Sequence, residues 1–245
     1  MTPELSLVVP VHNEVDNLAQ LVAEIRAALD DRVDYEVIYV DDGSDDGTAP
    51  RLRAVAAGFP RLRIVRHREQ AGQSAAVVDG VRAARAAWVA TLDGDGQNDP
   101  ADLLPMLAMV RDPAAPPGLS LIIGQRRQRQ DVWAKRAAGR IANTVRARVL
   151  GDATPDTGCG LKLFARDAFL AVPQFDHMHR FLPALFLRSG WQVASVPVSH
   201  RPRRHGRSHY GILDRLWVGI LDLTGVLWLQ RRPLRATIVE EPDAS

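Results

Sequence analysis

The sequence is poor in cysteine and lysine and has no long apolar run. Its single cysteine, Cys159, excludes an internal disulfide and fits a reducing compartment. Lysine occurs only at positions 135 and 162, so arginine carries nearly all of the positive charge. The N-terminus, MTPELSLVVPV, lacks the basic and long apolar parts of a signal peptide, and no apolar run reaches the length of a membrane span. We therefore expect a cytoplasmic protein.

The overall charge is small. The formal net charge is +2 and the sequence pI is about 9.0, so attraction to an anionic partner must come from local clusters of charge. Hydrophobic residues make up 46% of the chain, which is ordinary for a packed globular core. A length of 245 residues suits one α/β domain, with or without an appendage.

Strand-like and helix-like segments alternate along the first half of the chain. We expect buried strands at 5–11, 35–40, 62–65, 88–92 and 119–123, and helical periodicity between them, including a helix at 74–87. The later pattern is less regular, with expected strands at 161–164 and 190–198 and expected helices at 132–150 and 181–188. This alternation predicts an α/β fold with a Rossmann-like, mostly parallel central sheet flanked by helices.

Three polar loops follow expected strands, at 12–14, 41–44 and 93–97. Because ligands of parallel sheets bind at the carboxyl ends of the strands, we expect these loops to form one site. Asp93 and Asp95 repel each other unless a cation lies between them, and paired carboxylates suit Mg²⁺ or Mn²⁺. An acidic loop that merely starts a helix is the structural alternative. Asp41 is expected to form a turn with Ser44.

Six segments together carry a family resemblance. They are VVPVHNE, YVDDGSDDGT, LDGDGQNDP, Gly124-Gln125-Arg126, DTGCGLKLF and PVSHRPRRHGRSHYG. In this order and spacing the chain resembles a family 2 glycosyltransferase of GT-A fold, in the branch of dolichyl-phosphate and polyprenyl-phosphate sugar synthases. The resemblance covers residues 5–230 and implies a GT-A domain at 1–209, an amphipathic helix at 210–232 and a tail at 233–245.

The resemblance implies site residues on the donor side. The residues expected to line the nucleotide base and ribose are Pro10, His12, Glu14, Val40 and Asp42. The DxD segment implies that Asp95 and Gln97 hold Mg²⁺ or Mn²⁺, that Gly94 approaches the diphosphate and that Asp93 lies near the sugar or ribose. Asp93, Asp95 and Arg126 are the implied catalytic residues, acting by position and charge.

Two basic clusters suggest a phosphate acceptor. Eight basic residues and one acid lie within 126–148, and four Arg and three His lie within 200–210. No nucleic-acid-binding motif accompanies them, whereas two arginine clusters can clamp a phosphate dianion. The resemblance places Arg203 and Ser208 at phosphates. The acceptor ligands stay open among Lys135, Arg136, Arg140, Arg203 and Arg207, since Gly139 and His209 stand where the family often has Ser and Lys.

The implied reaction is inverting transfer of a hexose, of mannose or glucose type, from a GDP- or UDP-sugar to dolichyl or undecaprenyl phosphate, as in dolichol-phosphate mannosyltransferases. A lipid phosphate needs no general base, because its second pKa is about 6. One alternative is a family 2 enzyme that acts on a saccharide or small-molecule hydroxyl. Another is a nucleotide-binding module without catalysis. A glycine-rich dinucleotide-binding turn is missing at 11–14.

The segment 210–232 predicts an amphipathic helix. Gly211, Asp214, Arg215, Val218, Asp222 and Gly225 fall on one stripe, and large apolar side chains fill the opposite side. Such a helix either packs on the core or lies at a membrane interface, for which Trp217, Trp228 and the arginines after 230 are suited. A lipid acceptor favours peripheral attachment to the cytoplasmic face of the membrane, with self-association as a further option.

Overall fold

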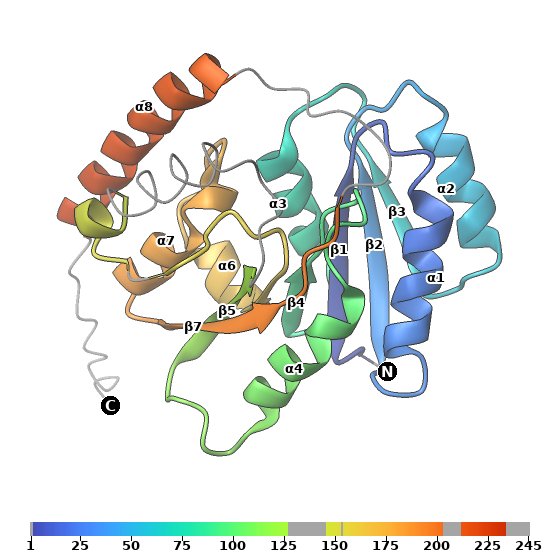
Figure 1. Cartoon of the computed structure of the whole chain (residues 1–245), viewed down its shortest axis with the longest axis horizontal. Helices are drawn as coiled ribbons and strands as arrows, with labels where there is room; N and C mark the ends of the chain where they lie inside the picture. The colour runs from blue at the N-terminus through green and yellow to red at the C-terminus, as the bar shows by residue number, and fades with distance from the viewer. Residues whose placement is uncertain (1, 127–145, 153, 203–211, 234–245) are drawn as a thin grey trace, which may run out of the picture.

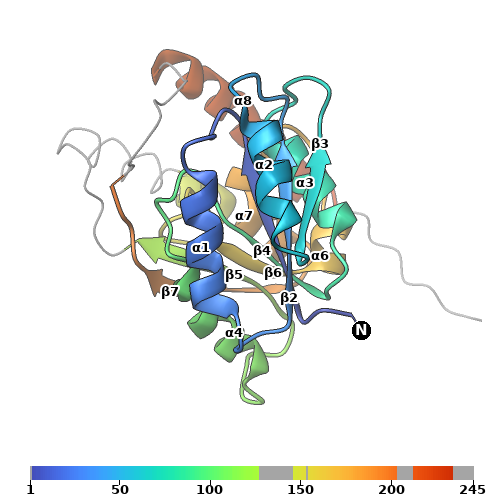
Figure 2. The same cartoon turned by 90° about the vertical axis from the view of Figure 1, so that its right-hand side faces the viewer.

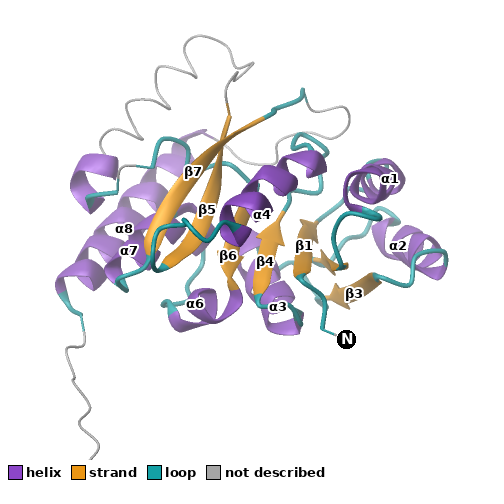
Figure 3. Cartoon of the chain, turned by 90° about the horizontal axis from the view of Figure 1, so that it is seen from below, coloured by secondary structure: helices purple, strands orange, loops and turns teal. Residues whose placement is uncertain are grey.

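A computed structural model describes residues 2–126, 146–152, 154–202 and 212–233, without the side chains of 212–218. Within these residues the strands form a seven-stranded sheet in the order β3-β2-β1-β4-β6-β5-β7. Helices cover both faces, with α1 and α4 on one and α3 and α6 on the other (Figure 3). The predicted α/β fold with a mostly parallel central sheet is confirmed.

The strands are β1 (Leu5–Val11), β2 (Tyr35–Asp41), β3 (Leu62–Arg66), β4 (Trp88–Thr91), β5 (Leu119–Arg126), β6 (Lys162–Ala165) and β7 (Gln192–Val198). The helices are α1 (Leu18–Leu29), α2 (Thr48–Ala57), α3 (Gln73–Ala83), α4 (Leu103–Arg111), α6 (Arg166–Ala171), α7 (Leu182–Arg188) and α8 (Ile212–Arg231), with short 3-10 turns η1 (Pro100–Asp102) and η2 (Met178–Arg180).

β1 lies at the centre of the parallel part of the sheet. It pairs in parallel with β2 on one side and β4 on the other, and β2 pairs in parallel with β3. A strand covered on both faces needs a continuous apolar run, which explains the sequence LSLVVPV. The helix α3 packs closely here, because a Cβ at Gly80 would lie 2.3 Å from Val8 Cγ1.

Several element boundaries differ from the sequence predictions, and one late strand has neighbours that the sequence did not predict. α3 ends at Ala83 instead of continuing to 87, because Glu36 and Ser6 of the sheet accept the N–H groups of Arg85 and Ala86 at 2.7 and 3.0 Å. β5 continues to Arg126 through its parallel pairing with β7. β6 runs antiparallel between β4 and β5, so a late strand enters the middle of the sheet.

α8 lies at the edge of the molecule, beyond α7 (Figures 1 and 2). Val226 is buried, and Arg188 of α7 donates to the carbonyl of Leu229 at 2.8 Å. Asp222, from the polar stripe, faces the protein and lies 3.1 Å from His177 Nδ1. The helix therefore packs on the core through one face. None of the helices in the described ranges is long and apolar enough to cross a membrane.

Glu36 is a buried carboxylate at the core of the sheet. It accepts hydrogen bonds from Ser6 Oγ, Arg85 N and Arg63 Nη1 at 2.7, 2.7 and 2.8 Å. Burial alone would raise the pKa of Glu36, but these hydrogen bonds outweigh it and lower the pKa below the ordinary value of 4.5. The ionised form of Glu36 therefore stabilises the fold at a pH above 4.5, the ordinary pKa of glutamate.

Glu36→Gln should lower the free energy of unfolding by about 2 kcal/mol near neutral pH, because an amide NH₂ would face donors that now meet a carboxylate. The difference from wild type should shrink as the pH falls through the lowered native pKa, since the wild-type carboxyl then protonates too. Urea unfolding across this pH range measures both effects. Glu4→Gln, at a surface pair with Arg111, is the control with little expected change. Equal stability of Glu36→Gln and wild type at neutrality would refute the prediction.

Candidate active site

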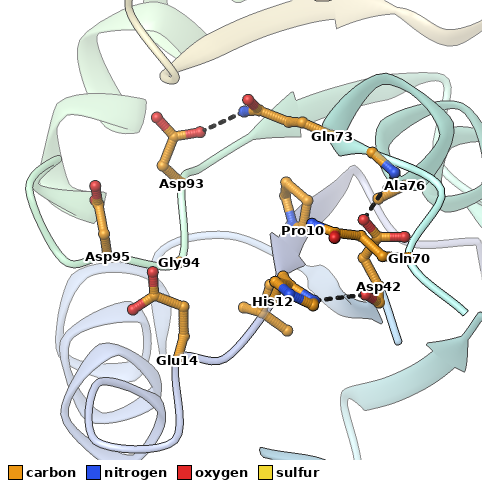
Figure 4. A pocket seen from close by; sticks show the side chains of 12 residues that line it. Pro10, His12, Glu14, Asp42, Gln70, Gln73, Ala76, Asp93, Gly94 and Asp95 are labelled. Carbon is orange, nitrogen blue, oxygen red and sulfur yellow. Dashed lines mark hydrogen bonds between the residues drawn. The ribbon is translucent and has the colours of Figure 1, made fainter. Parts of the chain in front are cut away.

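A cavity of about 500 Å³ opens at the carboxyl ends of β1, β2 and β4. It is lined by Pro10, Val11, His12, Glu14, Asp42, Gln70, Gly72, Gln73, Ala76, Asp93, Gly94 and Asp95. Glu14, Asp93 and Asp95 lie along one side, and Asp42 and Gln70 lie on the other (Figure 4). The structure thus brings the three predicted loops together at one edge of the sheet.

Asp42 organises the turn that leads into α3. Its Oδ1 accepts from Ala71 N at 2.8 Å and lies 2.7 Å from His67 Nδ1, while its Oδ2 accepts from Gly72 N at 2.9 Å. The carbonyl of Asp42 lies 2.7 Å from His12 Nδ1. A carboxylate offers about four acceptor positions, so three of them hold the wall of the cavity. Sequence reasoning missed His67, because nothing local marks it as a partner of Asp42.

Asp41, by contrast, is structural, as predicted. Its side chain is buried, and its Oδ1 accepts the N–H of Ser44 at 3.0 Å. Arg66 Nε lies 3.1 Å from Asp41 Oδ2. The two adjacent aspartates therefore have different roles, one closing a turn and the other bordering the cavity.

The loop after β4 presents two carboxylates. Asp93 Oδ1 accepts from Gln73 Nε2 at 3.0 Å, and Asp95 Oδ1 accepts from Gln97 N at 3.1 Å. Gly94 must be glycine here, because a Cβ would lie 2.4 Å from Val11 Cγ1. The close contact with β1 fixes where the loop leaves the sheet, and it leaves both carboxylates beside the cavity.

The donor chemistry of this loop fits Mg²⁺ or Mn²⁺, since carboxylate oxygen is the ligand that these cations prefer. Among the described residues, no group of three or more His, Cys, Asp or Glu side chains is placed to hold a metal ion by itself. Mg²⁺ often takes only one or two carboxylates, together with substrate phosphates. The fit is therefore to a cation that binds with a diphosphate.

Gln97 and Arg126 lie outside the set of residues that line the cavity. Gln97 Nε2 donates to the carbonyl of Arg201 at 3.3 Å, so the amide contacts the segment after β7. Arg126 ends β5 and donates from Nε and Nη2 to Asp156 at 2.6 and 2.7 Å. Burial opposes the charge of Arg126, but its bonds to Asp156 outweigh burial and raise its pKa.

Val40 does not reach the cavity either, because its side chain is fully buried in β2 beneath Gly80 of α3. The structure therefore places it in the core. Six further predicted phosphate contacts fall outside the described ranges: Lys135, Arg136, Arg140, Arg203, Arg207 and Ser208.

The DTGCG segment forms the floor beneath Asp93. A Cβ at Gly160 would lie 2.0 Å from Asp93 Oδ2, so any larger residue would have to displace that carboxylate. The buried Lys162 donates to the carbonyl of Cys159. Burial lowers the pKa of Lys162, against the negative charges of Asp93 and Asp156. Sequence reasoning assigned no role to Gly160 or Lys162, although a glycine pair and a lysine in an apolar strand were visible signals.

Gly160→Ala should displace the Asp93 carboxylate. Because Asp93 is a predicted catalytic residue, the variant should lower the predicted sugar transfer about a hundredfold, the cost of a shift near 1 Å at a reacting centre. Initial rates with saturating donor measure the loss. Gly158→Ala is the matched control in the same segment, because its Cβ would make only an ordinary 3.5 Å contact with Arg126 Nη2. Equal activity of the two variants would show that Gly160 does not set the position of Asp93.

The chain is similar to a known protein family and to named relatives. Residues 6–172 match the family model described as glycosyl transferase family 2. A dodecaprenyl-phosphate galacturonate synthase of Rhizobium johnstonii is 37% identical, over 95% of this chain and 69% of that protein. An undecaprenyl-phosphate 4-deoxy-4-formamido-L-arabinose transferase of Edwardsiella ictaluri is 34% identical, over 95% of this chain and 70% of that protein.

Two solved structures share the fold at low identity. Glucosyl-3-phosphoglycerate synthase from Mycobacterium tuberculosis, in complex with Mn²⁺, UDP-glucose and glycerol 3-phosphate, has a TM-score of 0.66 and 20% identity over 93% of this chain and 80% of that chain. A mannosyltransferase from Pyrobaculum calidifontis, in complex with GDP-mannose and Mn²⁺, has a TM-score of 0.62 and 22% identity over 85% and 59%. With the family model matching well over half of its length, the chain belongs to glycosyl transferase family 2.

Proposed function

We propose that this family 2 glycosyltransferase moves a sugar from a nucleoside diphosphate to a polyprenyl phosphate. The observation that carries the donor half is the cavity at the carboxyl edge of the sheet that is lined by Asp42, Asp93 and Asp95. The acceptor half is supported by the two relatives whose names contain dodecaprenyl and undecaprenyl phosphate. The predicted basic segments around Arg126 and Arg203 suit a phosphate headgroup.

The chain's own residues divide the work by position. Asp42 and His12 border the end of the cavity expected to take the base and ribose, and Glu14 lies near Asp95 on the opposite side (Figure 4). Asp95 would hold Mg²⁺ or Mn²⁺ with the diphosphate, and the cation would offset the charge that grows on the leaving group. Asp93, fixed by Gln73 and Gly160, would face the sugar.

The acceptor oxygen needs no base from the protein. A phosphate monoester is already anionic near neutrality, because its second pKa is about 6. Direct attack on the anomeric carbon breaks its bond to the diphosphate and inverts the anomeric centre. Arg126, held by Asp156, would contribute charge from the end of β5. The predicted transferred sugar is a hexose of mannose or glucose type, while the two relatives are named for galacturonate and 4-deoxy-4-formamido-L-arabinose.

A transfer assay tests this proposal. Polyprenyl phosphate is incubated with radiolabelled UDP- and GDP-sugars, including glucose, mannose and galacturonate, with Mn²⁺ or with EDTA. Label should enter the organic phase with one donor class and only without EDTA. Label confined to aqueous products would favour the hydroxyl-acceptor alternative, and no product from any donor would favour the non-catalytic one.

Asp95→Asn should reduce metal-dependent transfer about a hundredfold or more, because the variant loses a charged oxygen ligand while keeping the shape of the side chain. Its thermal unfolding midpoint should stay near that of wild type, which a melting curve checks. Asp112→Asn, in a surface turn where the carboxylate accepts from Ala114 N, serves as the control. Full activity of Asp95→Asn would remove Asp95 from the metal site.

We further propose that α8 contacts the membrane surface. Leu221 and Trp228 are 68% and 60% exposed on the side of the helix that faces away from buried Val226. Arg231 and Arg232, at the end of the helix, are exposed as well. Apolar side chains next to arginines suit the boundary between headgroups and acyl chains of anionic lipid.

The double variant Leu221→Ser and Trp228→Ser should bind phosphatidylglycerol vesicles at least about tenfold more weakly, because two large apolar side chains no longer enter the lipid. Vesicle sedimentation measures the bound fraction. Thr224→Ser, on the same exposed side of α8, is the control and should bind like wild type. Unchanged binding of the double variant would exclude this face as the membrane contact.

A further inference from the structure

Arg201 joins the segment after β7 to the loop that carries Asp95. Its N–H donates to the carbonyl of Gln97 at 2.8 Å, and its own carbonyl accepts from Gln97 Nε2 at 3.3 Å. The two residues are 104 positions apart in the sequence. These two hydrogen bonds attach the loop to the segment after β7. Neither residue belongs to a described strand.

The side chain of Arg201 reaches further. Nη1 donates to Glu24 Oε2 of α1 at 2.8 Å, and Nη2 donates to Asp99 Oδ2 in the same loop as Gln97. Burial opposes the charge of Arg201, but its bonds to Asp99 and Glu24 outweigh burial and raise its pKa. The guanidinium therefore bridges a helix and the loop as a permanent cation.

A second attachment lies two residues earlier. Ser199 N donates to Asp102 Oδ2 at 2.7 Å, at the start of the helix that follows the loop. Glu24 and Asp95 also line the same small cleft, so the carboxylate that anchors Arg201 is a neighbour of the predicted metal ligand. The contacts of Arg201 thus lie next to Asp95, at Gln97 and Glu24, and outside the open cavity.

The loop needs such support because glycines flank Asp95 on both sides. Gly96 has a φ of +70°, and no atom of the described residues lies within 4 Å of where its Cβ would be. Glycine gives the backbone more freedom than any other residue. Within the loop, Gln97 N donates to Asp95 Oδ1 at 3.1 Å, so a restraint on Gln97 passes directly to Asp95.

We propose that Arg201 is a positioning residue of the donor site, which holds Asp95 in place through Gln97 and Asp99. The inference rests on the proposed function, because it takes the loop to bind a cation with a nucleoside diphosphate. Arg201 itself touches no reacting atom. The carbonyl of Arg201 also holds Nε2 of Gln97, which restricts where the amide oxygen that is predicted to bind the metal lies.

Arg201→Gln tests the role of the guanidinium, because it removes the bonds to Glu24 and Asp99 and keeps the backbone bonds to Gln97. The binding of UDP and GDP is measured by calorimetry with Mn²⁺ and again in EDTA. Affinity with Mn²⁺ should fall about tenfold, the effect of losing a charge-assisted hydrogen bond or two. Affinity in EDTA should not change, because the contacts near Asp42 are untouched. Arg201→Lys should recover part of the loss, since one ammonium replaces part of the fork.

The matched control is Arg111→Gln. Arg111 makes a comparable two-pronged pair with Glu4, at 2.7 and 2.8 Å, away from the cavity. Arg111→Gln should leave the nucleotide affinity with Mn²⁺ and the nucleotide affinity in EDTA at wild-type values. Should Arg201→Gln fail to fold, Glu24→Gln removes one anchor of the guanidinium and should still weaken binding selectively with Mn²⁺.

Two results would overturn the positioning role: wild-type affinity with Mn²⁺, or an equal loss with Mn²⁺ and in EDTA. The second would mean that Arg201 only supports the fold. A wild-type protein that binds neither nucleotide would overturn the donor site and this role together. A wild-type protein that binds nucleotide with Mn²⁺ but transfers nothing to polyprenyl phosphate would refute the proposed acceptor alone and leave the role of Arg201 intact.

Discussion

The parallel pairing of β1 with β2 and β4 is the constraint on which the site depends. The register sets Val11 opposite Asp41 and Val8 opposite Thr91, so three loops leave the sheet at one edge. Parallel strands force this arrangement, because their carboxyl ends share an edge. The apolar side chains of β1 and β2 therefore do more than fill a core. They set the spacing between the carboxylates that border the cavity.

The part of the site next to these strands was predictable because its signals are local. Apolar runs predicted the strands, and polar residues after each run predicted the loops. The Asp41 turn followed from residue type, since aspartate binds the N–H groups of the residues just after it. The DGDG spacing identified Asp93 and Asp95 in the same way. Only the roles within each loop needed the family resemblance.

The rest is built by residues distant in sequence, and no local pattern reports such contacts. Arg126 and Asp156 are 30 positions apart, and Asp42 and His67 are 25 apart. β6 joins the sheet antiparallel between β4 and β5, which brings Gly160 beneath Asp93. Periodicity predicts a strand but not its neighbours. The exposed apolar residues of α8 were likewise predictable as amphipathic, whereas the side that packs on the protein was not.

Charge balance connects these distant contacts to the reaction. Glu14, Asp93 and Asp95 border the cavity, while Arg126 is engaged by Asp156 and Lys162 by the carbonyl of Cys159. Under the proposed function a diphosphate would lie beside these carboxylates, and Coulomb repulsion between like charges is strong where water is scarce. A divalent cation held by Asp95, as proposed, would offset this repulsion. The proposed transfer thus needs a cation held at a defined point, and a loop with glycine on both sides of Asp95 can define that point only when the surrounding structure holds it.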